Sequence, residues 1–314
     1  MREVHVAVAV VRRGGRVLIA RRPDGVHQGG LLEFPGGKVE AGETVQQALV
    51  RELAEETGLR VDPASLQPLI GIRHDYGDKR VFLDVWQTDT AEGEAEGREG
   101  QPVSWLAPAQ LQDEEFPAAN RAIIRALRLP SVYAVTGAFE NPGQGLALLE
   151  SGLARSRPEL VVLRAPWLEG QAYRDLARAA LAVCRRQRAG LMWHGPAAGT
   201  PEPGFAGWHL TWAQAARMQQ RPIDRHQWLA VSCHNTEQIR HARSLEADFI
   251  TLGPVRPTPS HPGAPTLGWS EFSALAATAT MPVYALGGMD KSHLETSCSS
   301  GGQGIAGIGH WWQP

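Results

Sequence analysis

The sequence contains little cysteine, and this shortage excludes two classes of protein. Its 314 residues include three cysteines, Cys184, Cys233 and Cys298. Their wide spacing gives no Cys-x-x-Cys pair and no zinc-binding pattern, and an odd number argues against a disulfide framework. We therefore expect free thiols inside the protein.

Net charge and long apolar runs are also lacking. The formal net charge is −2 at pH 7, so no overall positive field attracts a nucleic acid polymer. No stretch reaches the roughly 18 uninterrupted apolar residues that suggest a membrane span. The N-terminal residues Met1-Arg2-Glu3-Val4-His5 lack a signal-peptide pattern. These features predict a cytoplasmic protein that binds neither nucleic acid polymer nor membrane.

The first part of the chain has the pattern of a mixed α+β domain, which we place at residues 1–130. A Gly14-Gly15 turn joins two apolar strands, which indicates a hairpin. Strands are predicted at 4–11, 16–20, 81–86 and 103–106, and helices at 43–57 and 120–129.

After Pro130 the pattern changes to short apolar runs that alternate with helical stretches, which we assign to a second domain at 131–314. Strands are predicted at 132–135, 160–163, 190–193, 207–210, 228–231, 248–252, 282–286 and 304–308, and helices at 171–188, 211–219, 235–246 and 270–279. Eight such strands are typical of a parallel α/β barrel. The domain is shorter than a typical barrel of about 250 residues, so some helices must be reduced. An open, doubly wound sheet is the alternative.

The most informative segment is a glycine turn followed by an acidic helix. Residues 36–43 read Gly-Gly-Lys-Val-Glu-Ala-Gly-Glu, and 51–59 read Arg-Glu-Leu-Ala-Glu-Glu-Thr-Gly-Leu. Glu52, Glu55 and Glu56 share one helical face, where like charges repel unless a cation lies among them. Hard divalent ions such as Mg²⁺ prefer oxygen ligands and substrate phosphates. The segment therefore predicts a metal site for phosphate chemistry, whereas a merely solvated acidic helix leaves the glycine turn and Arg51 unexplained.

This segment resembles the signature of the Nudix hydrolases, with five residues between Gly37 and Glu43 and seven between Glu43 and Arg51. Nudix enzymes cleave a nucleoside diphosphate linked to another group, by attack of a metal-activated water on phosphorus. The resemblance implies an α+β Nudix fold with a mixed sheet between helices. It also implies that Arg51 pairs with Glu43, and that Mg²⁺, with Mn²⁺ as an alternative, is held by the Gly36 carbonyl, Glu52, Glu55 and Glu56.

Residues 1–130 are further similar to the MutT-type Nudix enzymes, which hydrolyse 8-oxo-dGTP to 8-oxo-dGMP and pyrophosphate. The matching stretches are Leu-Glu-Phe-Pro-Gly-Gly at 32–37, Arg-Glu-Gly-Gln-Pro at 98–102 and Glu-Phe-Pro-Ala-Ala-Asn at 115–120. They imply that Glu99 joins the metal shell as a candidate base and that Asn120 reads the purine edge. Phe34 would contact the base, and Arg22 and Lys79 would meet the nucleotide.

The residues alone leave other interpretations open. Phe34 could belong to the core, since aromatic side chains beside strands are commonly buried. Arg22 and Lys79 could be solvated surface charges. Asn120 could cap the helix that follows it without any role toward a substrate.

The second domain resembles the thiamine-phosphate synthase and thiazole tautomerase barrels through residues 133–136, 207–210, 231–235, 247–255, 258–263, 267–269 and 285–288. The resemblance implies a TIM-barrel-like fold whose strand ends bind a phosphorylated, thiamine-related ligand. Gly287 and Gly288 would offer backbone N–H groups to the phosphate, and Ser232 and Thr258 would offer hydroxyls.

Three departures put the synthase reaction in doubt. Pro166 stands where the synthases carry a lysine, Trp193-His194 where they carry Asn-Asp, and His261 where they carry a second lysine. Losing these charges removes most of what handles a pyrophosphate and Mg²⁺. His209, His234 and His261 lie near strand ends without metal-ligand spacing, so we expect polar barrel residues rather than a metal site.

The leading hypothesis is therefore an Mg²⁺-dependent hydrolase of 8-oxo-dGTP that removes an oxidised precursor before DNA replication can use it, which would serve DNA repair and mutation avoidance. The alternative is a Nudix hydrolase of another diphosphate, such as a thiamine-pathway pyrophosphate, with the barrel binding a phosphorylated ligand or regulating the hydrolase. In a third hypothesis the barrel senses a ligand or only acts as a scaffold.

Overall fold

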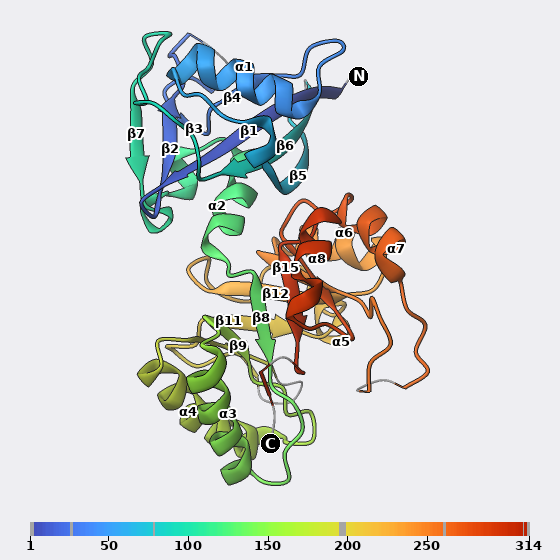
Figure 1. Cartoon of the computed structure of the whole chain (residues 1–314). Helices are drawn as coiled ribbons and strands as arrows, with labels where there is room; N and C mark the ends of the chain where they lie inside the picture. The colour runs from blue at the N-terminus through green and yellow to red at the C-terminus, as the bar shows by residue number, and fades with distance from the viewer. Residues whose placement is uncertain are drawn as a thin grey trace. The chain divides into compact units, whose positions relative to one another are not determined.

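The computed structural model describes residues 3–25, 28–77, 79–194, 199–259, 262–309 and 311–312, so His261 lies outside the described residues. The chain forms two compact units, Met1–Leu129 and Pro130–Pro314. Figure 1 colours the first from blue to green and the second from green to red. Each unit is described by itself.

The first unit is a mixed sheet with two main helices. Its strands are β1 (Glu3–Arg13), β2 (Arg16–Arg21), β3 (Leu32–Glu33), β4 (Gly36–Lys38), β5 (Gln67–Asp75), β6 (Arg80–Thr88) and β7 (Val103–Leu106), and its helices are α1 (Val45–Thr57) and α2 (Arg121–Arg128). The main strand order is β3-β2-β1-β6-β5, with β4 paired to β1 and β7 paired to β2. Strands β1 and β6 run parallel, and the other pairs are antiparallel.

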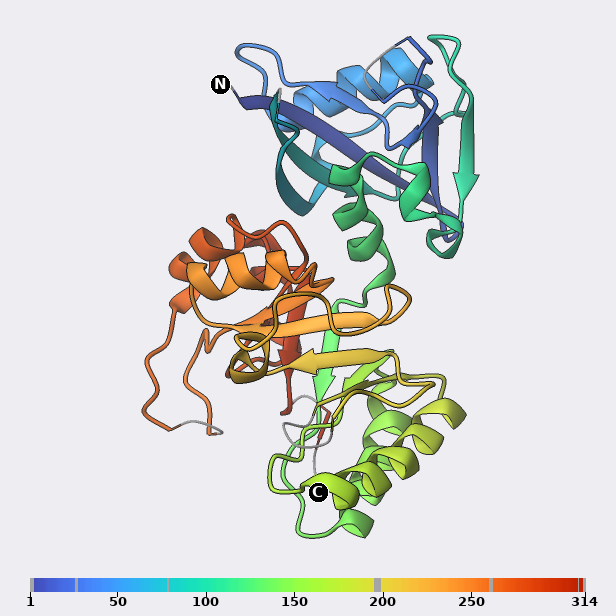
Figure 2. The same cartoon turned by 180° about the vertical axis from the view of Figure 1, so that it is seen from behind.

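Alternation along β1 places the sheet between the two helices. Ala7 and Ala9 pack with Leu49 and Leu53 of α1, whereas Val8 and its even-numbered neighbours pack with the apolar face of α2. Successive strand residues point to opposite faces, so one strand serves both cores. Figures 1 and 2 show α1 and α2 on opposite sides of the sheet. The predicted α+β Nudix fold is confirmed.

Most elements predicted in the first unit are confirmed, and the hairpin at Gly14-Gly15 joins β1 to β2. Strand β5 was not predicted. Its Pro68 and Gly71 are weak strand formers, and its register shifts between Pro68 and Ile70. The tertiary pairing with β6 supplies the order that the local sequence lacks.

The second unit is a closed barrel of parallel strands (Figure 2). Its strands are β8 (Val132–Val135), β9 (Leu160–Val162), β10 (Gly190–Trp193), β11 (Gly207–Leu210), β12 (Trp228–Cys233), β13 (Phe249–Leu252), β14 (Val283–Leu286) and β15 (Gly304–Gly307). Ile305 pairs with Val132, and Tyr133 with Leu160, so the last strand closes on the first. The predicted barrel is confirmed, and the open doubly wound sheet is wrong because that sheet would leave β15 and β8 unpaired.

The barrel helices are α3 (Pro142–Ser156), α4 (Gly170–Arg186), α5 (Trp212–Ala215), α6 (Thr236–Ser244), α7 (Gly268–Ala276) and α8 (Leu294–Ser299). Helix α3 was not predicted, because its glycines at 143, 145 and 152 lower helix propensity. The helix predicted at 211–219 is wrong beyond Ala215, where Arg217 and Met218 donate to carbonyls three residues back. Such short helices let a barrel form within this length.

The cysteines agree with the expectation of free thiols. Cys184, Cys233 and Cys298 are free, and the first two are buried. Among the described residues, no helix has both the length and the hydropathy that crossing a membrane requires.

Candidate active site

Helix α1 begins and ends at residues suited to those positions, and this places its carboxylates. Thr44 caps the N-terminus: its hydroxyl accepts the Gln47 N–H at 3.2 Å, and the Gln47 side-chain oxygen accepts the Thr44 N–H at 2.8 Å. Gly58 ends the helix in the left-handed conformation, with φ of 72°. Between these ends, Glu52 and Glu56 lie one turn apart on the face that borders the glycine turn.

Glu56 is the most perturbed acid of this face. Its Oε2 accepts the Gly36 N–H at 3.1 Å. Burial, and the nearby carboxylates of Glu52, Glu33 and Glu99, raise the pKa of Glu56 to about 7, against the Gly36 hydrogen bond, which lowers it. Four carboxylates therefore share a region where the charged form of Glu56 is disfavoured.

Close approach to backbone requires glycine at position 36, and glycine at position 37 leaves room for the Glu52 carboxylate where it lies. Gly36 has φ of 145°, and a Cβ there would lie 2.2 Å from the Ala7 carbonyl oxygen. A Cβ on Gly37 would lie 2.2 Å from Glu52 Oε1. The turn thus brings bare backbone against the carboxylates of α1.

Arg51 connects several of these acids. Its Nε and Nη2 donate to the Glu43 carboxylate at 2.8 and 2.9 Å, and its Nη1 donates to Glu52 at 2.7 Å and lies 3.4 Å from Glu55. The expected pairing of Arg51 with Glu43 is present. Hydrogen bonds from Arg51 and from the Glu40 N–H lower the pKa of Glu43 to about 2. Arg51 therefore holds both a distant acid and two acids of its own helix.

Glu99 reaches this region because its loop is fastened to the end of α1. The Arg98 N–H donates to the Glu56 carbonyl at 2.9 Å, and the Gln101 amide donates to the same carbonyl at 3.0 Å. Gln101 also accepts the Glu99 N–H at 2.9 Å. This latch, residues 97–101, places Glu99 close enough to affect the Glu56 pKa.

The acids suit a hard divalent cation, although they do not yet form a closed set of ligands. No three His, Cys, Asp or Glu side chains among the described residues are already gathered as ligands. Glu55 is exposed at 58% of its side chain. Burial is the main cause that raises the pKa of Glu56, and the carboxylates of Glu52, Glu33 and Glu99 add to it. A divalent cation would offset both effects.

A pocket of about 380 Å³ begins at the glycine turn and holds all four residues expected to contact a nucleotide. Its wall includes Arg22, Phe34, Gly36, Lys79 and Asn120. Apolar side chains of β1 and β6 and the 3₁₀ turn Ala118–Asn120 complete the wall. The structure therefore brings the expected base-side and phosphate-side residues to one cavity next to the carboxylate helix.

The alternatives for these residues are partly resolved. Phe34 is 4% exposed and stacks on Phe116 at 5.7 Å, so it belongs to the core and also lines the pocket. The capping interpretation of Asn120 is wrong, because its side chain makes no capping bond to α2. Backbone φ and ψ of −77° and −15° at Asn120 are already helical, which withdraws the side chain from the capping position. Arg22 forms an ion pair with Glu33 rather than standing free in solvent.

Three pocket or latch residues were missed. Glu33 pairs with Arg22, and burial raises its pKa. Tyr76 lines the pocket beside Lys79. Gln101 fastens the Glu99 loop. Glu33 and Gln101 lie inside the motif stretches at 32–37 and 98–102. Their position within these stretches was the sequence feature that could have marked them as site residues.

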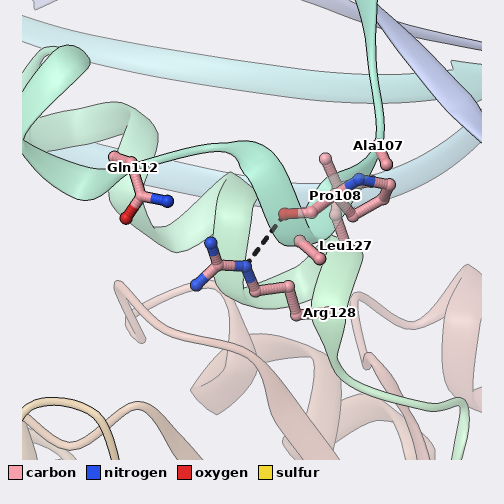
Figure 3. A pocket seen from close by; sticks show the side chains of 6 residues that line it. Ala107, Pro108, Gln112, Leu127 and Arg128 are labelled. Carbon is pink, nitrogen blue, oxygen red and sulfur yellow. Dashed lines mark hydrogen bonds between the residues drawn. The ribbon is translucent and has the colours of Figure 1, made fainter.

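A second hollow of the first unit, of about 680 Å³, contains no such chemistry. Figure 3 shows its lining residues, among which the Arg128 Nε donates to the Pro108 carbonyl at 3.0 Å. Arg128 Nη2 also donates to the Leu111 carbonyl. Among the described residues that line it, Arg128 is the one cation and is bound to backbone carbonyls, and none is a carboxylate. We therefore assign the site to the smaller pocket.

In the barrel, the expected phosphate-site residues follow strand ends. Ser232 lies on β12, Thr258 follows β13, and Gly287-Gly288 follow β14. Both glycines have positive φ, of 97° and 63°, and a Cβ on either would lie 2.6 Å from Pro254 or Pro257. Close packing therefore suffices to explain these glycines, whether or not they meet a phosphate.

The barrel histidines are mostly engaged with protein groups. His209 is 5% exposed and lies between the Tyr133 hydroxyl and the Ser232 hydroxyl, each at 2.9 Å. Burial lowers the pKa of His209 well below its usual value, so it is neutral at pH 7. His234 Nδ1 bonds to the Gly253 carbonyl. His209 and His234 are thus bound to protein groups.

The fold and the site define the class of this protein: a carboxylate-helix hydrolase unit for phosphate compounds, followed by a closed parallel barrel. Residues 6–126 match the NUDIX domain family, and residues 132–310 match the thiamine monophosphate synthase family.

Individual relatives agree with both matches. The 8-oxo-dGTP diphosphatase of Escherichia coli K12 is 37% identical over 129 residues, which is 41% of this chain and 98% of that protein. The CTP pyrophosphohydrolase of the same organism is 31% identical and covers 40% of this chain and 92% of its own length. A putative thiamine-phosphate synthase of Aquifex aeolicus is 28% identical and covers 58% and 97%. The chain belongs to the Nudix hydrolases through its first unit and to the thiamine monophosphate synthase family through its second.

Proposed function

We propose that the first unit is a divalent-metal-dependent pyrophosphohydrolase that converts 8-oxo-dGTP to 8-oxo-dGMP and pyrophosphate. The observation that carries the proposal is the pocket in which Asn120, Phe34, Arg22 and Lys79 share a wall with Gly36. The similarity to the E. coli 8-oxo-dGTP diphosphatase supports it. Such an activity removes an oxidised precursor before DNA synthesis can use it.

The carboxylates give this reaction its metal requirement. Glu52, Glu55, Glu56, Glu99 and the Gly36 carbonyl would hold Mg²⁺ or Mn²⁺, which supplies charge neutralisation for the phosphates and acidifies a bound water. Arg51 keeps Glu52 and Glu55 oriented. Glu99 at the tip of the latch is the candidate base that takes the proton of the attacking water.

Asn120 supplies the preference for the oxidised base. Its side chain makes no capping bond to α2, and the residue, only 7% exposed, lines the pocket. In 8-oxoguanine, N7 carries a hydrogen beside O6, and an amide can accept the first and donate to the second. In guanine, N7 is an acceptor and would face the amide oxygen, so the pairing is lost.

Replacing Asn120 tests this assignment. We expect Asn120→Ala to lower kcat/KM for 8-oxo-dGTP about ten- to a hundredfold, the loss for an unpaired buried polar group, with a much smaller change for dGTP. Asn141→Ala is the matched control, because Asn141 caps α3 in the barrel and should leave both values unchanged. Unchanged turnover of 8-oxo-dGTP by the Asn120 variant would remove the purine-reading role.

A second candidate is another diphosphate substrate. The similarity to a CTP pyrophosphohydrolase favours a nucleotide such as CTP, and the fused barrel favours a thiamine-pathway pyrophosphate. We place a phosphorylated ligand of the barrel near Ser232, Thr258, Gly287 and Gly288. A hydrolysis screen over these compounds, with products identified by mass, separates the candidates because each substrate yields a different monophosphate.

A further inference from the structure

Arg22 and Glu33 pair across neighbouring segments at the wall of the nucleotide pocket. Glu33 lies opposite Ala20 in the pairing of β2 with β3, and the Arg22 N–H continues that ladder by donating to the Leu31 carbonyl at 2.8 Å. Residues two apart on a strand point to the same face, so Arg22 and Glu33 are diagonal neighbours on one face. There the Arg22 Nη1 donates to the Glu33 Oε2. The strand register therefore brings this ion pair together.

Each member of the pair is partly buried and gains from the other. The side chains of Arg22 and Glu33 are 25% and 27% exposed. Burial raises the pKa of Glu33, whereas the charge and the hydrogen bond of Arg22 lower it, so the guanidinium replaces part of the lost hydration. In return, the carboxylate holds a long side chain that would otherwise sample many rotamers. Arg22 is therefore oriented before any ligand enters.

We infer that Glu33 is a positioning residue that holds the Arg22 guanidinium in the pocket wall, in place to bind the nucleotide. The inference rests on the proposed 8-oxo-dGTP activity and adds a residue to it. The pair shares the wall with Gly36 and Asn120, so a nucleotide in the pocket meets it. A bare carboxylate there would repel the phosphates of a nucleotide. Glu33 therefore aids binding only through Arg22, whose direction it fixes and whose charge balances its own.

The test measures binding of the product, 8-oxo-dGMP, to the full chain by titration calorimetry in EDTA, so the result does not depend on catalysis. We expect Glu33→Ala to raise Kd about fivefold, the usual value of one hydrogen bond, and Glu33→Gln, which keeps an acceptor oxygen, to raise it less. In hydrolysis of 8-oxo-dGTP, KM should rise in parallel while kcat stays within about twofold of wild type, the pattern of lost uniform binding.

The matched control is Asp113→Ala. Asp113 accepts from Arg125 at 3.0 Å in the same unit, and these side chains are 26% and 19% exposed, close to the values of the Glu33 pair. Asp113 does not belong to the pocket wall. Its loss should therefore leave the Kd for 8-oxo-dGMP unchanged. An equal rise of Kd in the Asp113 and Glu33 variants, with equal losses of melting temperature, would mean that Glu33 is merely structural.

A double-mutant cycle separates positioning from direct contact. In the Arg22→Ala background, Glu33→Ala should no longer weaken binding, because the group that Glu33 positions is gone. A loss that persists at full size without Arg22, or unchanged or tighter binding by Glu33→Ala with Arg22 present, would overturn the role of Glu33. A wild-type chain without preference for 8-oxo-dGTP over dGTP would overturn the proposed function instead, and the same cycle with dGMP would then judge Glu33 separately.

Discussion

At the scale of single residues, Glu56 shows a conflict between stability and function. Its folded pKa of about 7 lies above the ordinary value of 4.5, so the fold favours the protonated acid. Between these values the folded chain keeps a proton that the unfolded chain has lost, and raising the pH through 7 removes that stability. A metal site needs the charged form of Glu56. The metal-free protein is therefore less stable in the pH range in which that form, and with it the metal site, exists.

We therefore expect Glu56→Gln to be inactive yet more stable without metal. Glutamine keeps an acceptor for the Gly36 N–H and has no charge to bury. In EDTA its gain in free energy of unfolding should be near zero at pH 4, grow with pH, and level off above pH 7 at no more than about 3 kcal/mol. Urea unfolding across this pH range measures it. Glu55→Gln is the comparison, since a more exposed carboxylate should give little gain. A pH-independent difference would contradict the raised pKa.

At the scale of elements, the latch at 97–101 decides where Glu99 lies. Gln101 makes both of its amide bonds to backbone, one to the Glu56 carbonyl and one to the Glu99 N–H. A Cβ on Gly97 would lie 1.6 Å from the Gln101 carbonyl oxygen, so the loop closes tightly on itself. The loop is exposed, and its shape depends on these few bonds rather than on a core.

We expect Gln101→Leu to lower kcat about tenfold or more, because Glu99 would leave the region of Glu56, while the melting temperature changes by only a few degrees. Steady-state kinetics with saturating Mg²⁺ measure the loss. Gln110→Leu is the matched control, since Gln110 accepts the Ala107 N–H at 2.9 Å in another loop. Unchanged kcat in the Gln101 variant would show that the Gln101 bonds do not set the position of Glu99 for the reaction.

The elements also show how far the sequence predicts this protein. Helix α1 was predictable because its caps, its apolar spacing and its acids all indicate the same structure. Strand β5 and helix α3 were not, since Pro68, Gly71 and the α3 glycines oppose the conformation that tertiary packing imposes. In the site, motif spacing pointed to the acids. Tyr76 and the Arg22–Glu33 pair were missed because the pocket wall and an ion pair define them, and neither is visible in the motif spacing.

At the scale of the whole chain, each unit has its own core. The barrel core contains only residues from Val132 onward, and the two cores of the first unit end at Leu127. Trp311 belongs to the barrel core, where it is fully buried and donates to the Val135 carbonyl at 3.0 Å. Leu53 of α1 is its counterpart in the first unit and is also fully buried. Separate cores predict two unfolding transitions in calorimetry.

We expect Trp311→Ala to destabilise the barrel transition by about 3–5 kcal/mol, the usual cost of emptying a core tryptophan site. Hydrolysis of 8-oxo-dGTP at 25 °C should stay within about twofold of wild type, because the core of the barrel is separate from the cores of the first unit. Leu53→Ala should do the reverse: it should lower the melting temperature of the first unit, and it should reduce hydrolysis at temperatures close to that transition. Thiamine monophosphate, if the barrel binds it, should raise only the barrel transition. If Trp311→Ala cuts hydrolysis in proportion to its destabilisation, or if the ligand changes kcat, the barrel instead braces or regulates the hydrolase.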